Sequence, residues 1–219
     1  DEHDAYFAEL AQFVSDGLAA CGYSYCKGGI MATNPRWRQP LKVWRQYFSE
    51  WIERPNPETL LNASIFFDLD GLYGETELVE NLKDLLAQKA SASPAFLAAL
   101  ARNALNRTPP LGFFRTFVME TDGRQKQIIN LKGRGTAPLT DLIRVHALAC
   151  ASTAQNSFER LEAISATTLL QPAAIEHLRY ALEFLSMVRI RHQADAIEQG
   201  QAADNYIEPE RFSSSERHN

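Results

Sequence analysis

The chain has 219 residues, of which 45% are apolar and 22% charged, the proportions of an ordinary globular protein with one or two domains. Its formal net charge of -5 argues against a general grip on nucleic acid, because neutralising phosphates needs a basic excess. No apolar run approaches the ~20 residues of a membrane-spanning helix, and the first residues lack the features of a signal peptide. We therefore expect a soluble, cytoplasmic protein that binds neither nucleic acid nor a membrane.

Cysteine and histidine give little support for a disulfide framework or a zinc site. Cys21, Cys26 and Cys150 show no repeated metal-knuckle spacing, and we expect Cys21 and Cys26 to be reduced rather than paired. The histidines include no His-x-x-x-His spacing. The chain begins without methionine and ends just after residues 213–217, where a helix is expected to begin, so we expect a fragment of a longer protein.

The first third of the chain predicts two helices and a strand. Apolar residues recur at helical spacing over residues 3–20, and after an irregular loop a second helix is expected over residues 41–52. Prolines 55 and 57 end that helix. A β-branched and aromatic run then predicts a buried strand over residues 61–69, with the carboxylates of Asp68 and Asp70 at its end before Gly71.

The rest of the chain has the composition of a helical domain, and we place the domain boundary after Gly74, which gives domains at 1–74 and 75–219. Helices are expected over residues 76–90, from Ser93-Pro94, over 137–152, from Asn156 and over 172–197. A hairpin is expected from strands at 113–120 and 127–132 with a turn at Asp122-Gly123. The predicted fold class is α+β, predominantly α-helical, with a helical bundle and a small β-hairpin.

Asp68 is the strongest candidate for chemistry. An acid at the exposed end of a buried strand is a usual position for a metal ligand or a base. The alternative is that Asp68 and Asp70 only end the strand and open a turn.

Two basic segments are candidate sites for an anionic group. The apolar stripe of the last helix continues onto Arg189 and His192, which with Arg191 and Gln193 could line a pocket for phosphate or carboxylate. The alternative is that these residues complement the helix dipole. Lys132-Gly133-Arg134-Gly135 precedes another helix, where glycines and a helix N-terminus favour an anion, although such segments are also common turns.

The helix after that turn contributes further polar residues. Asp141 and Arg144, three residues apart, could join the anion site or form a surface pair. His146 lies on the apolar stripe of the same helix and is interpreted as a core histidine.

A third candidate lies in the loop before residue 41. Trp37 with Arg36 and Arg38 could stack on and clamp a nucleotide, and the alternative is loop packing. The sequence contains no dinucleotide-binding glycine motif, P-loop, nucleophile elbow or His-Glu-x-x-His motif, so several large enzyme classes lose support.

A series of short segments matches one family in the same order over nearly the whole chain. They are Asp16-Gly17-Leu18, Cys21-Gly22-Tyr23, residues 28–38, residues 64–68, residues 110–114, Asn130-Leu131-Lys132, Ala137-Pro138-Leu139, residues 141–144, Glu159-Arg160-Leu161, residues 189–193 and Asp204-Asn205-Tyr206. Together they resemble a bacterial family of nucleotidyltransferase-like proteins that sits behind cyclic-nucleotide-binding and CBS domains in signalling proteins.

The resemblance implies a fold and a reaction. The first portion is similar to the later part of a polymerase-β-like nucleotidyltransferase fold, related to protein-PII uridylyltransferase and glutamine synthetase adenylyltransferase. The second is similar to a helical substrate-binding domain, in which Asn205 is expected to be a substrate-binding residue. The implied reaction passes a nucleoside monophosphate from a triphosphate to an acceptor with Mg²⁺ held by three carboxylates. Asp68 matches the third carboxylate, whereas Asp70 receives no metal role.

The family's Gly-Ser loop and its paired acids are expected upstream of Asp1, so this chain alone is expected to be inactive. The leading hypothesis is the C-terminal fragment of a signalling nucleotidyltransferase. Its partners would be a nucleoside triphosphate, an acceptor that could be a PII-type protein, and upstream sensor domains of the same chain. The alternatives are a non-catalytic module that binds a ligand or partner, and a bundle that forms a homodimer.

Overall fold

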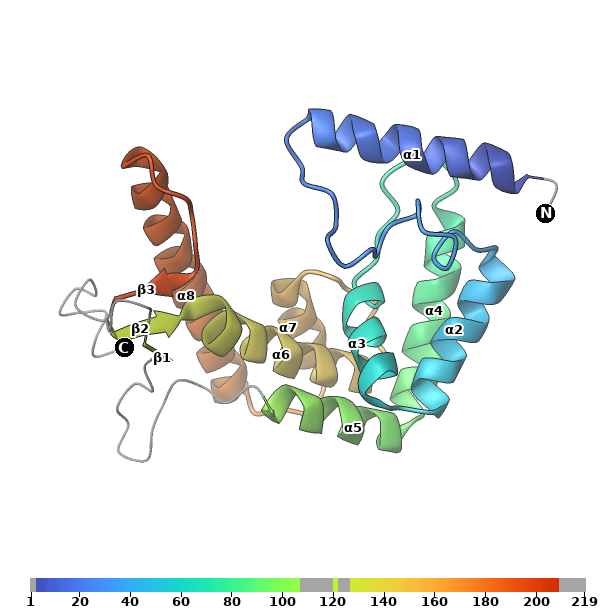
Figure 1. Ribbon diagram of the computed structural model, residues 1–219. Coiled ribbons are helices and arrows are strands. Elements are labelled where there is room, and N and C mark those ends of the chain that lie inside the picture. Colours follow the sequence, from blue (N-terminus) through green and yellow to red (C-terminus); the bar gives the residue numbers. More distant parts are fainter. Residues whose placement is uncertain (1–2, 107–119, 122–126, 209–219) are drawn as a thin grey trace. The chain divides into compact units, whose positions relative to one another are not determined.

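The computed structural model describes residues 3–106, 120–121 and 127–208 (Figure 1). These residues are mostly helical and include a small antiparallel sheet, so the predicted α+β, predominantly α-helical class is confirmed. The chain divides into two compact units, residues 1–48 and 49–219. The functional boundary that we place after Gly74 stays a prediction.

The first unit holds α1 (Asp4–Ala20), a long loop and the start of α2 (Leu41–Glu53). Both helices match the predicted ranges closely. Within the described residues of α1 only Ala11 is buried, so the apolar stripe that predicted this helix is largely exposed.

Residues 57–66 form a helix, α3 (Pro57–Phe66), and the strand predicted over residues 61–69 is wrong. The side chain of Asn56 accepts hydrogen bonds from the backbone N–H groups of Glu58 and Thr59, and the Thr59 hydroxyl accepts one from the Asn56 N–H. This capping box, with Pro57 in the first turn, starts a helix in a run whose β-branched and aromatic content suggested a strand. Burial of Leu60, Ala63 and Phe67 then follows helical spacing.

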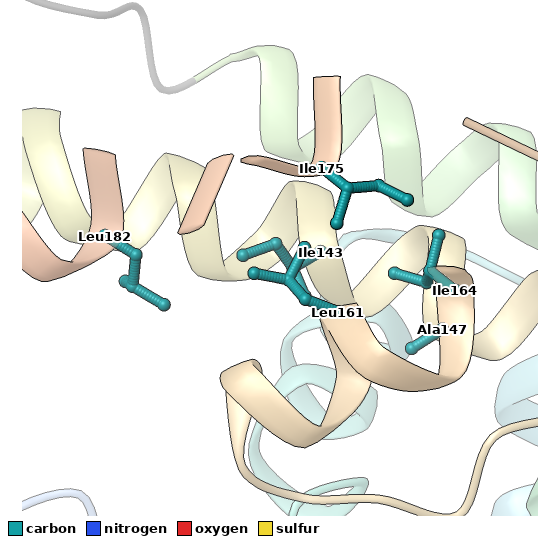
Figure 2. Packing of buried hydrophobic residues seen from close by; sticks show 6 residues of the cluster. All are labelled: Ile143, Ala147, Leu161, Ile164, Ile175 and Leu182. Atoms are coloured by element: carbon teal, nitrogen blue, oxygen red, sulfur yellow. The ribbon is translucent and has the colours of Figure 1, made fainter. Parts of the chain in front are cut away.

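The core of the second unit is built from helices that follow the predicted ranges. They are α4 (Glu77–Ser91), α5 (Pro94–Leu105), α6 (Ala137–Ala149), α7 (Ser157–Ser165) and α8 (Pro172–Glu198). One apolar cluster joins α6, α7 and α8, and Figure 2 shows its side chains, Ile143, Ala147, Leu161, Ile164, Ile175 and Leu182. This packing fixes α6 and α7 relative to each other, and both carry site residues.

In the described residues, β1 (Glu120–Thr121), β2 (Gln127–Asn130) and β3 (Tyr206–Ile207) form one antiparallel sheet. Pairing of β1 with β2 confirms the predicted hairpin, whereas β3 was not predicted. Several predicted features lie outside the described residues. They are the rest of the first strand of the hairpin, its turn at Asp122-Gly123, the segment 110–114 and the helix start expected at 213–217.

Lys132–Thr136 is a π-helical turn, η1, that runs directly into α6, rather than the glycine loop that the sequence suggested. The side-chain oxygen of Asn130, just before this turn, accepts a hydrogen bond from the Gly133 N–H at 2.7 Å. These residues are therefore the start of a helix rather than a glycine loop.

Candidate functional site

Asp68 lies directly after α3, where its carboxylate contacts the guanidinium groups of two arginines. Arg144 of α6 donates from Nη2 to Oδ2 at 2.5 Å and from Nε to Oδ1 at 3.3 Å. Arg160 of α7 donates from Nη2 to Oδ1 at 2.6 Å. Both carboxylate oxygens are thus engaged in charge-assisted hydrogen bonds, one pair of them in the bidentate form that arginine favours.

The two arginines are more deeply buried than the acid that they bind. The side chains of Arg144 and Arg160 are 7% and 4% exposed, against 34% for Asp68. Arg144 also donates from Nη1 to Asp141 at 2.6 Å, and Arg160 from Nε to the Ala154 carbonyl at 2.8 Å. Two positive and two negative charges therefore balance in this group, which we call the Asp68 cluster: Asp68, Asp141, Arg144 and Arg160.

One donor in the Asp68 cluster is left over. The Nη1 atom of Arg160 is buried and has no hydrogen-bond partner among the residues that the structure describes. A buried guanidinium donor without a partner is costly, so this atom marks a place where a further acceptor would be stabilising.

The pKa values of the cluster keep both partners charged. Burial acts to raise the pKa of Asp68, but the hydrogen bond and charge of Arg144, followed by those of Arg160, outweigh it and hold the pKa below its ordinary value. For Arg144, burial acts to lower the pKa, and the contacts with Asp68 and then Asp141 raise it on balance.

These surroundings do not fit Mg²⁺. Both oxygens of Asp68 already accept from arginine, and a cation would have to enter beside two guanidinium groups. In the part of the chain that the structure describes, no three His, Cys, Asp or Glu side chains come together to hold a metal ion. The catalytic and metal-binding roles of Asp68 stay predictions that follow from the resemblance.

A second group of predicted residues comes together at the C-terminal half of α8. Arg189 donates from Nε to the Asn205 side-chain oxygen at 3.1 Å, and Gln193 donates to the same oxygen at 3.3 Å. His192 contacts Asp204 at 2.9 Å between Nε2 and Oδ1. The structure thus joins residues of α8 to the segment that precedes β3, which the sequence could not show.

The η1 turn contacts the same half of α8. Arg189 also donates from Nη1 to the hydroxyl of Thr136 at 3.3 Å, and Gly135 packs near Leu185 of α8. Lys132 of this turn is exposed and Arg134 is half-buried. We call this group the α8–η1 site; it consists of Arg189, His192, Gln193 and Asn205, together with Lys132 and Arg134 of the turn that contacts α8 through Gly135 and Thr136. Asp141 and Arg144 belong to the Asp68 cluster.

The aromatic and basic residues of the first unit hold their own loop. Trp37 is buried and stacks on Trp44 with ring centroids 6.0 Å apart, while the Arg36 guanidinium lies 4.6 Å from the centre of the Trp37 ring. Arg38 donates to the carbonyls of Ala32 and Thr33 and pairs with Asp4 at 3.2 Å. Loop packing accounts for these contacts, and the nucleotide clamp stays a prediction.

Sequence reasoning missed the role of Arg160. The signal for it was available, because Arg160 falls beside Leu161 and Ile164 on the buried face of α7. A charged residue on an apolar stripe has to find a counter-ion, and Asp68 supplies it.

Two family models match segments of this chain. A family model described as "Putative nucleotidyltransferase substrate binding domain" matches residues 94–219, which is more than half of the chain. A second, described as a putative nucleotidyltransferase, matches residues 1–58, so Asp68 lies between the two matched segments. No curated protein and no solved structure matches the chain. Among the described residues, no helix is long and apolar enough to cross a membrane.

Proposed function

Because this chain belongs to the nucleotidyltransferase-related family with a substrate-binding domain, we propose that its second unit binds an anionic substrate of nucleotidyl transfer at the α8–η1 site. A nucleoside triphosphate is the substrate that the family implies. The part of the reaction assigned to this chain is binding, since the residues around Asp68 do not fit Mg²⁺.

One observation carries this proposal: two basic segments that are more than 50 residues apart in sequence meet in the fold. Lys132 and Arg134 come from η1, and Arg189 comes from α8, where it contacts Thr136 of η1. Their positive charges are suited to the oxygens of a phosphate or a carboxylate. The carboxylate of Asp204, which contacts His192, is a negative charge near this site. The attraction for an anion therefore depends on Lys132, Arg134 and Arg189.

The finer reaction is part of the same proposal. The intact protein would transfer a nucleoside monophosphate to a protein or small acceptor, in the manner of protein-PII uridylyltransferase, in the bacterial cytoplasm. Upstream cyclic-nucleotide-binding and CBS domains would regulate it. The resemblance of the segments from Asp16 to Tyr206 supports this assignment.

The test is a calorimetric titration of UTP, ATP and a PII-type protein into this chain. The double variant Lys132→Ala, Arg134→Ala removes two exposed or half-exposed cations, and each lost charge-assisted contact is worth roughly 1.5–3 kcal/mol. We expect at least a tenfold weaker affinity. Arg102→Ala, which removes an exposed arginine from α5, is the matched control. Unchanged affinity in the double variant would contradict the α8–η1 site.

The second candidate function is a regulatory module that binds a ligand or partner without chemistry, either as a monomer or as a homodimer. The engagement of both Asp68 oxygens with arginine favours it. Labelled nucleoside triphosphates and the full-length protein separate the two functions. Transfer of label that is lost in Asp68→Asn supports catalysis, whereas binding with no transfer supports the regulatory module. Light scattering over a range of concentrations tests the homodimer.

A further inference from the structure

The two arginines of the Asp68 cluster are held in place by contacts other than Asp68. Arg144 is fixed from the other side by Asp141, and Arg160 by the Ala154 carbonyl. Both stems lie in helices that share the apolar cluster of Figure 2. If the Asp68 carboxylate left, the guanidinium groups would therefore still converge on the position that it occupies.

Asp68 is the removable member of the cluster. Its side chain is 34% exposed, and it lies on the connection between α3 and α4, where Leu72 and Tyr73 are 95% and 99% exposed. The backbone of this connection is held separately, because Gln155 donates a hydrogen bond to the Leu69 carbonyl. Rotation of one side chain would then release the carboxylate without unfolding the connection.

Removal of the carboxylate leaves a site that requires an anion. The remaining cluster would hold two positive charges and one negative charge in a nearly dry environment, where an unpaired charge is strongly unfavourable. The Nη1 atom of Arg160 already lacks a partner with Asp68 in place. A phosphate group offers more acceptor oxygens than a carboxylate and could use this donor as well.

We infer that Arg144 and Arg160 form an oxyanion-binding site that the Asp68 side chain occupies as an internal ligand. The ligands that would replace it are a carboxylate or a phosphate group of an incoming molecule. This site is separate from the α8–η1 site and does not depend on the proposed function.

The experiment removes the internal ligand and supplies it from solution. Asp68→Ala is melted in chloride, acetate and inorganic phosphate at equal ionic strength, and phosphate binding is measured by titration. We expect Asp68→Ala to melt below the wild type in chloride and to recover in acetate or phosphate. We expect Asp68→Ala to bind phosphate at least about tenfold more tightly than the wild type. In the wild type the site is available only while the Asp68 side chain is displaced. Recovery in acetate alone indicates an acidic side chain of a partner as the natural ligand, and recovery in phosphate indicates a phosphorylated one.

The matched control is Asp70→Ala, two residues away on the same connection and paired with Lys83 at 3.9 Å. It should show neither the loss nor the anion-specific recovery. General stabilisation by phosphate acts on every variant, so the response of Asp70→Ala measures that general effect. Asp68→Ala with Arg160→Gln should lose the recovery. The inference is overturned if Asp68→Ala melts like the wild type, if anions do not restore it, or if Asp70→Ala responds equally. Should Asp68→Ala not fold in chloride, Asp68→Asn is measured in its place, and failure of both to fold in acetate and in phosphate also overturns it.

Discussion

At the scale of single residues, the Asp68 cluster shows how a buried charge constrains its neighbours. Arg160 is buried on α7 with Leu161 and Ile164, and removing water from a guanidinium costs several kcal/mol unless an acid is near. The acid comes from 92 positions away in sequence. Helical periodicity predicts that Arg160 lies on the buried face of α7, but the local sequence around it does not indicate which acid is its counter-ion.

The first residue-scale prediction concerns acid pH and Asp68. The pKa of Asp68 is lowered in the folded protein, so its ion pairs stabilise the fold above the unfolded pKa of about 4 and lose this contribution as pH falls through the folded value. Urea unfolding of the wild type and Asp68→Asn from pH 7 to pH 3 should show a gap in unfolding free energy that narrows at the acid end. A gap that stays constant with pH would show that the ionised carboxylate is not its source.

The second residue-scale prediction concerns His146, which the sequence placed on the apolar stripe of α6. The residue is half-buried, and this burial lowers the pKa of its imidazole. The neutral ring is therefore favoured in the fold, and stability is lost as pH falls below about 6.5, where the unfolded chain takes up the proton. The variant His146→Gln should lose less unfolding free energy than the wild type between pH 7.5 and pH 5.5. An equal loss in the two proteins would contradict a buried neutral ring.

At the scale of elements, α3 shows where sequence reasoning failed and why. Residues 61–69 have the composition of a strand, but Asn56 and Pro57 just upstream are the stronger signal, because they satisfy the first N–H groups of a helix. The segment that contains Asn56 and Pro57 follows the end of α2 and begins α3. From the sequence, it is interpreted only as the end of the preceding helix. By contrast, helices α5 to α8 carry caps or prolines at their starts together with helical spacing, and their ranges were predictable to within a few residues.

The element-scale prediction tests this cap. Asn56→Ala removes two accepted hydrogen bonds, from Glu58 and Thr59, and should lower the unfolding free energy by about 1 kcal/mol. Ser93→Ala at the start of α5 removes one long bond of 3.4 Å to the Phe96 N–H and should cost less. Both are measured by urea unfolding with circular dichroism. An equal or larger loss in Ser93→Ala would show that the Asn56 cap does not set the start of α3.

At the scale of the whole molecule, the sequence could predict which elements exist but not which residues they bring together. The η1 turn and the end of α8 each carried a weak anion signal, and only the contact of Arg189 with Thr136 makes them one site. The pairing of β3 with β2 positions Asn205 beside α8, although β3 is too short for its sequence to predict it. Such long-range contacts depend on packing of apolar faces, for which many partners are equally suitable in sequence.

Salt provides the last prediction, because the molecule has two opposed electrostatic effects on an anionic ligand. The net charge of -5 repels a nucleoside triphosphate from a distance, whereas Lys132, Arg134 and Arg189 would attract it at contact. At 0.1 M salt the screening length is about 10 Å, so the spread net charge is already mostly screened and the contact term dominates. Affinity for UTP should therefore fall between 50 and 300 mM NaCl, and more steeply in the wild type than in the Lys132→Ala, Arg134→Ala variant.

The melting temperature in the same buffers is the control for a general effect of salt on the fold. It should change little, because the Asp68 cluster is largely buried and weakly screened. Affinity that rises with salt would mean that repulsion by the net charge outweighs the α8–η1 site, and the assignment of substrate binding to that site would fail.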